Sequence, residues 1–169
     1  HGGAFAATGI DVGTRFLLGF LDQMAPDARV AIDLGCGTAI LAAAVARSRP
    51  GIEVLASDES HAAVASARAT AAANGVEIEV VRDVGLSTRA SASADLVLLN
   101  PPFHTGSTVH AGIALALFTE AARVLRPGGE LWTVYNSHLQ YRPALTRVVG
   151  ETRQAGRNDK FTVTVSTRR

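Results

Sequence analysis

The strongest constraint on the fold is an alternation between short apolar runs rich in β-branched residues and longer stretches rich in alanine and leucine. The short runs predict buried strands, and the longer stretches predict helices. Strands that alternate with helices form crossover units, which assemble into a parallel sheet covered by helices. The chain is therefore predicted to be an α/β protein with a doubly wound sheet.

The alternation gives definite boundaries for the expected elements. Strands are expected at residues 29–33, 52–57, 77–82, 96–99, 130–135 and 161–167. Helices are expected at residues 14–21, 39–47, 59–73, 112–125 and 141–149. Asn74 and Gly75 end the helix before them, and the Arg-Pro-Gly-Gly segment at 126–129 ends another. No repeat or linker divides the 169 residues, so one domain is expected.

Composition excludes several classes of protein. Apolar residues make up 47% of the chain, which is enough to bury a sizeable core. No strictly apolar run approaches the ~20 residues that span a bilayer, which excludes an integral membrane protein. Cys36 is the single cysteine, so no internal disulfide is possible. His104, His110 and His138 lack the spacing of metal ligands, and no metal site is expected.

Basic residues concentrate at the C-terminal end of the chain. Residues 140–169 hold six arginines and one lysine against two acidic residues, whereas the rest of the chain carries more acids than bases. The candidates for contacts with nucleic-acid phosphates are Arg142, Arg147, Arg153 and Arg157. The pattern is equally typical of a solvated surface strand and tail.

The N-terminal twenty residues, which lead into the helix expected at 14–21, fall outside the alternation of strands and helices. They begin with His1 instead of a methionine, which is typical of a piece of a longer protein. Turn-forming residues precede the first expected helix, and such a segment most often covers the edge of a sheet. Phe5, Gly9 and Asp11 are also spaced in a way that would suit a lid over a cofactor.

A glycine-containing loop stands where the first expected strand passes into a helix. Asp33 precedes Gly35 and Gly37, with Cys36 as a small packing residue between the glycines. Glycine permits the tight turn and lets backbone approach a ligand, and the amides at the following helix start attract anions. Position 40 is Ile, so the third glycine of the dinucleotide-binding pattern is missing. A carboxylate before the glycines suits the ammonium or hydroxyl groups of a ligand better than a pyrophosphate.

Two more carboxylates follow strands. Asp58 comes after the second expected strand, where a carboxylate accepts hydrogen bonds from a ribose diol; its alternative role is to cap the next helix. Asp83 ends the third strand, where it can receive an adenine amino group or serve a turn. The carboxyl ends of parallel strands share one edge of the sheet, and ligands of open α/β sheets bind there. Together with Asp33, these residues predict a site for an adenosine-type ligand.

The most specific motif is Asn100-Pro101-Pro102-Phe103, after the fourth expected strand. Two consecutive prolines hold the chain extended, and Pro101 biases Asn100 away from helix. The Asn100 side-chain oxygen and the Pro101 carbonyl can then point outward together and accept the two hydrogens of a planar amino group. Phe103 can stack on the ring that carries the amine. The alternative is a rigid loop with a capping asparagine and a buried phenylalanine.

The order of these motifs resembles that of class I S-adenosylmethionine-dependent amino-methyltransferases. Further segments resemble the catalytic domains of bacterial ribosomal RNA guanine-N2 methyltransferases. They are Thr8-Gly9-Ile10-Asp11-Val12-Gly13, Asn136-Ser137-His138-Leu139-Gln140-Tyr141 and Asn158-Asp159-Lys160-Phe161. The resemblance covers essentially the whole chain. It implies a seven-stranded, mostly parallel, Rossmann-like methyltransferase sheet with an antiparallel C-terminal strand.

The resemblance also implies a role for each candidate residue. The residues implied to hold S-adenosylmethionine are Phe5, Gly9, Asp11, Asp33, Gly35, Gly37, Asp58, Asp83 and Asn100. The implied catalytic residues are Asn100, Pro101, Pro102 and Phe103. The residues implied to contact the substrate are Phe103, His104, Asn136 and His138. Residues 1–22 would form a cofactor-covering segment within a single methyltransferase domain, residues 1–169, that is the C-terminal catalytic part of a longer protein.

The implied reaction is methylation of the exocyclic amine of guanine in ribosomal RNA or a ribosomal subunit, in the cytoplasm, with no membrane or metal involved. Other functions stay open from the sequence. The same Asn-Pro-Pro loop serves methyltransferases that modify a glutamine in a protein or the amino group of adenine. A catalytically silent methyltransferase-like domain that only binds RNA is a further alternative. Dinucleotide-dependent redox chemistry is disfavoured, because the third glycine is missing.

Overall fold

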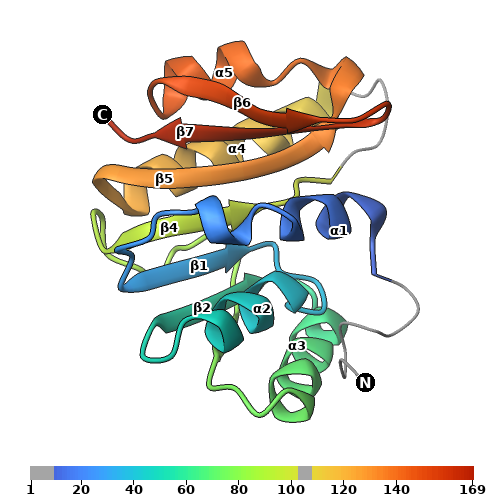
Figure 1. The fold of residues 1–169 in the computed structure, drawn as a ribbon, viewed down its shortest axis with the longest axis vertical. Helices are drawn as coiled ribbons and strands as arrows, with labels where there is room; N and C mark the ends of the chain where they lie inside the picture. Colours follow the sequence, from blue (N-terminus) through green and yellow to red (C-terminus); the bar gives the residue numbers. More distant parts are fainter. Residues whose placement is uncertain (1–9, 103–107) are drawn as a thin grey trace.

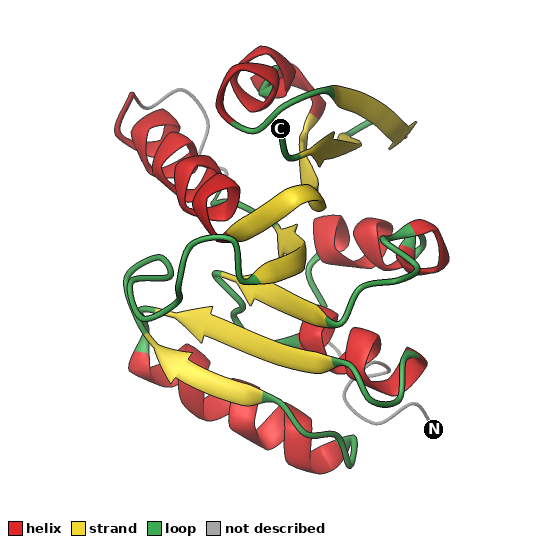
Figure 2. Ribbon diagram, turned by 90° about the vertical axis from the view of Figure 1, so that its left-hand side faces the viewer, coloured by secondary structure: helices red, strands yellow, loops and turns green. Residues whose placement is uncertain are grey.

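The protein folds as a central sheet between two layers of helices, as seen in a computed structural model that describes residues 10–102 and 108–169 (Figure 1, Figure 2). Within these residues the sheet has seven strands in the order β3-β2-β1-β4-β5-β7-β6. The strands are β1 Val30–Leu34, β2 Glu53–Asp58, β3 Glu79–Arg82, β4 Ala94–Leu99, β5 Leu125–Asn136, β6 Thr152–Arg157 and β7 Phe161–Thr167. Neighbours among β1 to β5 pair in parallel, whereas β7 is antiparallel to both β5 and β6. This confirms the predicted mostly parallel sheet with a reversed C-terminal strand.

The helices divide between the two faces of the sheet. They are α1 Val12–Leu18, α2 Ile40–Ser48, α3 His61–Ala73, α4 Thr108–Val124 and α5 Arg142–Val148, with short 3-10 turns at η2 Leu21–Gln23 and η3 Ser137–Leu139. α1, α2 and α3 cover one face, and α4 and α5 cover the other (Figure 1). In the part of the chain that is described, no helix is long and apolar enough to cross a membrane.

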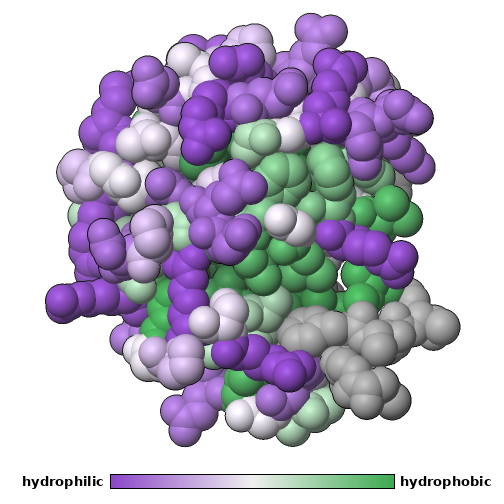
Figure 3. Space-filling model, viewed as in Figure 1, coloured by the Kyte–Doolittle hydropathy of each residue, from purple (hydrophilic) through white to green (hydrophobic). Residues whose placement is uncertain are grey.

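Strand β1 shows why the sheet is apolar on both sides. Successive side chains of a strand point to opposite faces. Ala31 packs in the core under α1 to α3, and Ile32 and Leu34 pack in the core under α4 and α5. Asp33 therefore faces the α2 side, where its side chain is 2% exposed. Partly buried Phe16, Leu18 and Phe20 extend the first core outward. The face shown in Figure 3 is apolar in its middle.

The expected elements are present, with differences of a few residues at their ends. α4 begins at Thr108, four residues earlier than expected, and the first helix stops at Leu18 before η2. β5 begins at Leu125 because this residue pairs with Ala94 before the Arg-Pro-Gly-Gly segment interrupts the ladder. Pairing with β4 resumes at Glu130, which is where the strand was expected to begin.

Strand β6 was missed by the strand pattern of the sequence. Its residues, Thr-Arg-Gln-Ala-Gly-Arg, do not alternate between apolar and polar, because the strand lies at the edge of the sheet and pairs only with β7. Gly156 packs directly on the Phe20 ring, and a Cβ at this position would clash with that ring. The strand is thus held by β7 and by Phe20 instead of by apolar side chains of its own.

Candidate active site

Two neighbouring cavities open at the carboxyl ends of the parallel strands, the edge where ligands of open α/β sheets bind. The first, which we call the β2–α4 cavity, has a volume of about 310 Å³. The second, the α1–α2 cavity, has a volume of about 250 Å³. Gly35 and Asn100 line both. Together the cavities offer an elongated site that is large enough for a small ligand.

The walls of the two cavities differ in chemistry. The β2–α4 cavity has carboxylates on one side, from Asp58 and Asp83, and apolar Ile113 and Leu117 of α4 on the other. The α1–α2 cavity lies between the start of α1 and the loop that follows β1. Its lining includes Asp11, Thr14, Asp33, Gly35, Cys36, Gly37, Thr38 and Asn100. The structure therefore brings together all the predicted cofactor residues that it describes.

The loop after β1 needs both of its glycines. Gly35 has φ +65° and Gly37 has φ +53°, a conformation that favours glycine. A Cβ on either residue would meet nothing within 4 Å, so both face open space. The Cys36 N–H donates to the Ser57 carbonyl at 2.9 Å and ties the loop to β2, while burial raises the pKa of the Cys36 thiol. The predicted tight turn is confirmed, and close approach by a ligand stays a prediction.

Asp33 is a buried carboxyl at the end of β1. Its Oδ2 accepts a hydrogen bond of 3.0 Å from the Ala42 N–H in α2. Burial raises the pKa of Asp33 to about 7, although the Ala42 bond lowers it and nearby Asp58 raises it further. A cationic group in the α1–α2 cavity would therefore find a carboxyl that is ready to ionise near neutral pH.

Asp58 joins the glycine loop to the end of β2. Its Oδ2 accepts from the Gly37 N–H at 2.9 Å, and its Oδ1 accepts from the Ser60 N–H at 2.9 Å. Ser60 is the residue that caps α3, by accepting from the Ala63 N–H, so the helix-cap alternative for Asp58 is wrong. Each carboxylate oxygen has a second lone pair. The predicted contact with a ribose diol therefore remains compatible with these bonds and stays a prediction.

Asp83 organises the loop after β3. Its carboxylate accepts from the Ser87 hydroxyl at 2.5 Å and from the Thr88 N–H at 3.2 Å. Partial burial would raise the pKa of Asp83, but these hydrogen bonds outweigh it and hold that pKa below its usual value. The turn role is therefore present. The predicted contact with adenine stays a prediction, supported by the position of Asp83 in the wall of the β2–α4 cavity.

Asn100 follows β4 and has an asymmetric set of hydrogen bonds. Its Nδ2 donates to Asp11 Oδ2 and to Thr14 Oγ1, both at 2.9 Å. Its Oδ1 is buried and has no partner within residues 10–102 and 108–169. A buried acceptor without a donor costs about 1–3 kcal/mol, and such groups often mark functional sites. Pro101 is buried, and Pro102 is exposed and lines the β2–α4 cavity.

The remaining predicted residues fall into two groups. Phe5, Gly9, Phe103 and His104 lie outside the described residues. Asn136 and His138 lie at the carboxyl end of β5, where Asn136 Oδ1 and His138 Nδ1 are 2.6 Å apart. Neither residue is among the described residues that line the two cavities. Their predicted contact with a substrate stays a prediction.

The structure adds three residues that the sequence did not point to. Thr14 holds the Asn100 amide from a position 86 residues earlier in the chain, and no sequence pattern signals this contact. Ile113 and Leu117 form the apolar wall of the β2–α4 cavity. Their spacing of four residues on a helix after the Asn-Pro-Pro motif is a signal that could have identified them.

A larger cavity, of about 610 Å³, lies at the opposite edge of the sheet. It is lined by residues that precede β1 and β2, such as Arg29 and Ile52. The guanidinium of Arg49 in its wall donates to backbone carbonyls of Leu21 and Ala25 at 3.0 and 2.8 Å. These bonds stabilise the turn after α1. The Arg49 guanidinium is therefore already used in a structural role. Size alone therefore does not identify the site.

Comparison with known proteins agrees with this geometry. The family model of the methyltransferase small domain matches residues 1–165. The chain belongs to this family. The "Ribosomal RNA large subunit methyltransferase G" of Streptomyces avermitilis is 46% identical over 96% of the chain, which covers 43% of that relative. The protein of the same name from Pseudomonas aeruginosa PAO1 is 41% identical over 96% of the chain and 44% of the relative.

Among solved structures, the T. thermophilus 16S rRNA N2 G1207 methyltransferase in complex with AdoMet and guanosine superposes with a TM-score of 0.83. It is 27% identical and matches 98% of the chain and 45% of its own length. The chain thus spans less than half the length of these relatives. The predicted resemblance to ribosomal RNA methyltransferases and the class I methyltransferase fold are confirmed for this methyltransferase small domain. Within the described residues, no group of three or more His, Cys, Asp or Glu side chains could hold a metal ion.

Proposed function

We propose that this methyltransferase small domain transfers a methyl group from S-adenosylmethionine to the exocyclic amine of a guanine in ribosomal RNA. The observation that carries the proposal is the buried Oδ1 of Asn100, which has no donor among the described residues. Asn100 lines both cavities, and an amino group would supply the missing donor. The names of the relatives, and the AdoMet and guanosine bound by the T. thermophilus enzyme, support the choice of cofactor and base.

The two cavities fit the two halves of the cofactor. In the β2–α4 cavity, Asp58 would accept from the ribose hydroxyls, and Ile113 and Leu117 would pack against the adenine. In the α1–α2 cavity, the Asp33 carboxyl would face the ammonium of the methionine part. The open space at Gly35 and Gly37 leaves room for this part of the cofactor. The donor set of carboxylates at one edge of the sheet suits a ligand with hydroxyl and ammonium groups.

Catalysis would consist mainly of alignment. When bound, the cofactor supplies a methyl carbon on a sulfonium, which bonds to the amine nitrogen as the carbon–sulfur bond breaks and the sulfur keeps the electron pair. Asn100 Oδ1 and the Pro101 carbonyl would accept the two amine hydrogens and turn the nitrogen lone pair toward the methyl group. Phe103 would stack on the base. The amine proton becomes acidic as the nitrogen is methylated and leaves to water.

The proposed substrate sets two further requirements. The target guanine must be unpaired or flipped out of a helix to reach Asn100. The RNA backbone must be held near the carboxyl edge of the sheet, where β6 ends at exposed Arg157 and the turn into β7 carries exposed Lys160. We place the activity in the cytoplasm, where bacterial ribosomal RNA resides.

The proposal is tested by incubating the protein with S-adenosylmethionine labelled in the methyl group and deproteinised ribosomal RNA, followed by nucleoside analysis. Label in N2-methylguanosine is the expected result, and Asn100→Ala should abolish most of it. Label in methylated adenosine, or in a glutamine of an added protein, would assign the activity to another amine. RNA binding without any transfer would identify a catalytically silent domain and contradict the proposal.

A further inference from the structure

We infer that Asp11 and Thr14 are positioning residues that fix the orientation of the Asn100 amide, so that the site accepts an amino group and rejects a carbonyl. The inference rests on the proposed function, because it concerns the group that Asn100 presents to the target base. It also gives Asp11 a role that differs from the cofactor contact implied by the sequence resemblance. The inference follows from the hydrogen bonds, the burial and the space around Asn100.

The amide of asparagine has two ends of similar shape and opposite hydrogen-bonding character. The Asp11 carboxylate only accepts hydrogen bonds, so it selects the NH₂ end of the Asn100 amide. The distance from Asn100 Nδ2 to Asp11 Oδ2 is 2.9 Å, and Thr14 Oγ1 accepts the second hydrogen at the same distance. Both N–H groups are thus used on the α1 side. The buried Oδ1 is the end of the amide that lacks a partner among the described residues.

The carboxylate is itself held in place by the start of α1. Asp11 is the N-cap of this helix, and its Oδ2 accepts from the Thr14 N–H at 3.0 Å. The same oxygen therefore receives one hydrogen from the Thr14 backbone and one from Asn100. Since the helix fixes Thr14, it also fixes the two acceptors that face the Asn100 amide.

Gly13 supplies the space that this arrangement needs. A Cβ on Gly13 would lie 3.1 Å from Asp11 Oδ2 and 3.6 Å from Asn100 Nδ2. It would also lie 3.3 Å from Cε1 of Phe161 in β7. A side chain at this buried position would therefore push against the hydrogen-bonded pair of Asp11 and Asn100. The sequence Asp11-Val-Gly13-Thr14 thus forms one structural unit around the Asn100 amide.

The unit also disfavours the wrong orientation. If the Asn100 amide flipped, its carbonyl oxygen would face the Asp11 carboxylate, and two acceptors would oppose each other. The NH₂ end would then point to the substrate, where it would bind a carbonyl oxygen. Asp11 therefore both stabilises the orientation that reads an amine and destabilises the one that reads a carbonyl.

Thr14 offers the cleanest test, because valine has nearly the same shape and lacks the hydroxyl. We expect Thr14→Val to lower the single-turnover rate of RNA methylation by about 10- to 100-fold, the range for a misplaced reacting group. Thr14→Ser restores the acceptor and should restore most of the rate. Thr14 also lines the α1–α2 cavity, so cofactor affinity is titrated in both variants. Because the change acts mainly through Asn100, we expect Thr14→Val to lower the methylation rate by more than it lowers the affinity for S-adenosylmethionine.

Thr119→Val is a matched control for the chemistry of the substitution. Thr119 is an exposed residue of α4 whose hydroxyl donates to the Leu115 carbonyl at 2.9 Å. It contacts neither cavity among the described lining residues, so the same substitution should leave the methylation rate unchanged. A loss of rate in this variant equal to that in Thr14→Val would overturn the inference.

Asp11→Asn tests the selection between an amine and a carbonyl. The new NH₂ group can donate to the Asn100 oxygen and stabilise the flipped amide. Guanosine and xanthosine differ at the relevant position, since xanthosine has a carbonyl where guanosine has the amine. We expect the preference for guanosine over xanthosine, measured as competitive inhibition of methylation or as direct binding, to fall by about tenfold or more. An unchanged preference would contradict the inference.

A measurement without RNA separates this inference from the proposed function. The side-chain NH₂ protons of Asn100 should exchange slowly with water in NMR spectra, and Thr14→Val should speed up their exchange. If the wild-type protein methylates no ribosomal RNA and these protons are protected, the proposed function fails while the positioning of the amide stands. If the protons are unprotected, or if Thr14→Val weakens cofactor binding as much as it lowers the rate, Asp11 and Thr14 do not act through Asn100.

Discussion

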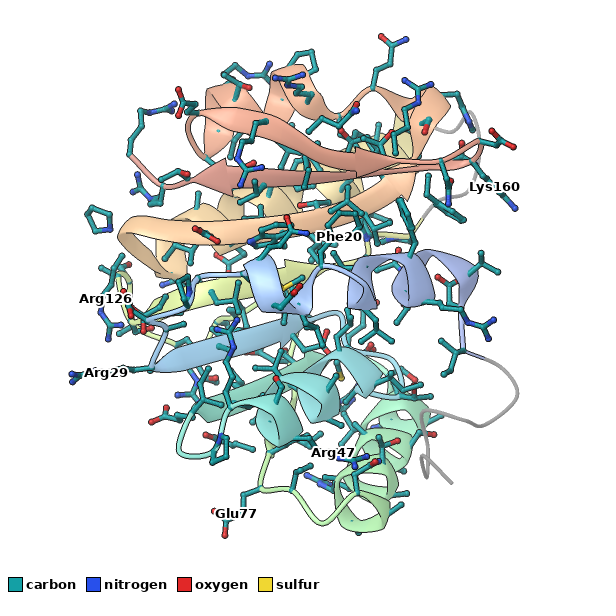
Figure 4. All side chains as sticks on the ribbon, in the orientation of Figure 1. Phe20, Arg29, Arg47, Glu77, Arg126 and Lys160 are labelled. Atoms are coloured by element: carbon teal, nitrogen blue, oxygen red, sulfur yellow. The ribbon has the colours of Figure 1, made fainter. Side chains whose placement is uncertain are left out.

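The two edges of the sheet contain similar residues and use them differently. At the amino edge, where β1 begins, Asp95 accepts from the N–H groups of Arg29 and Val30 at 2.9 and 3.0 Å and pairs with Arg126 at 2.6 Å. At the carboxyl edge, where β4 ends, the Asn100 oxygen is buried and unpaired among the described residues. Figure 4 shows Arg29 and Arg126 at one end of the molecule and Lys160 at the other.

Other polar side chains also differ between the two edges in how fully they are hydrogen-bonded. At the amino edge, Glu130 Oε1 accepts from the Ala25 N–H and from the Trp132 indole at 2.9 and 2.8 Å. At the carboxyl edge, burial raises the pKa of Asp33 to about 7, because a single backbone N–H offsets little of the cost. The cavity at the amino edge is the larger one. Between these two edges, the unsatisfied group that lines a cavity lies at the carboxyl edge, whereas cavity volume alone would point to the amino edge.

The largest expected effect comes from Asn100→Ala, which removes the unpaired oxygen. Losing one oriented polar group at a reacting centre typically costs ~2.7–4 kcal/mol, or about 100- to 1000-fold in turnover. Cofactor affinity should change little, because the residue is expected to act on the target amine. Single-turnover methylation at saturating RNA, paired with a titration of the cofactor, measures both. Turnover close to that of the wild type would place the chemistry elsewhere.

Asp33 and Asp95 should respond to pH in opposite ways. The pKa of Asp33 is raised in the folded state, so between its unfolded value of ~3.9 and about 7 the folded protein holds a proton that the unfolded chain releases. The stability contributed by Asp33 is therefore present below about pH 4 and is lost as the pH rises to 7. Asp33→Asn keeps an acceptor for the Ala42 N–H. We expect it to stabilise the protein at pH 8 by a few kcal/mol at most, with no gain near pH 4.

Asp95 is the matched case from the amino edge. Its partial burial would raise its pKa, but hydrogen bonds from Arg29 and Arg126 hold that pKa below its usual value. Its contribution is present above about pH 4 and is lost as the pH falls through the lower folded value. Asp95→Asn should cost about 1–2 kcal/mol at pH 7, less than a fully buried pair, because the side chain is 26% exposed. Denaturant titrations at several pH values measure how each substitution changes the free energy of unfolding. If this change varies with pH in the same direction in both variants, Asp33 and Asp95 do not respond to pH in opposite ways.

Asp58→Ala should act on cofactor binding, with a smaller effect than Asn100→Ala has on turnover. Loss of charge-assisted hydrogen bonds to the ribose would weaken S-adenosylmethionine by about 1.5–3 kcal/mol, measured by calorimetry. Asp58 also holds the Gly37 N–H, so a loosened loop is a competing cause. Ser60→Ala is the control, because it removes the cap of α3 and leaves the Asp58 carboxylate in place. An equal loss of affinity in both variants would assign the effect to the fold around α3.

The sequence predicted those parts of the fold that depend on a local sequence pattern, such as an apolar run or a glycine at a turn. β1 and β4 are buried on both faces, so their apolar runs were visible in the sequence, and Gly35 and Gly37 sit where φ is positive. β6 has no such signal, because an edge strand packed on Phe20 needs few apolar residues of its own.

The site was predictable where the order of the strands determines which residues lie close together. Asp33, Asp58 and Asn100 lie at the carboxyl ends of neighbouring parallel strands, so their meeting at one edge could be inferred from the strand order alone. The contact of Asn100 with Asp11 and Thr14 joins residues 89 and 86 positions apart. This contact depends on how α1 packs against the sheet, and no local sequence pattern predicts that packing.

The smallest expected effect concerns RNA binding, and the structure shows that two of the four candidate arginines do not share a face of the sheet. Arg153 pairs with Val165, which belongs to the core under α1, whereas Arg157 pairs with Thr162 on the other face of the sheet. Cross-strand partners point to the same face, so these arginines point to opposite faces. Lys160 is the better candidate for a contact with RNA at the carboxyl edge. It lies in the turn that leads into β7, beside the end of β5.

Lys160→Ala and Arg29→Ala therefore form a matched pair from the two edges. If RNA lies across the carboxyl edge, Lys160→Ala should reduce the slope of log binding constant against log salt by about 0.7, the value for one contact with a single strand. Arg29 is exposed at the amino edge, and its loss should leave the slope unchanged. Salt titrations of RNA binding measure both slopes. An equal change in the two variants would show that the protein attracts RNA by its overall charge, with no preference for the edge that carries Asn100.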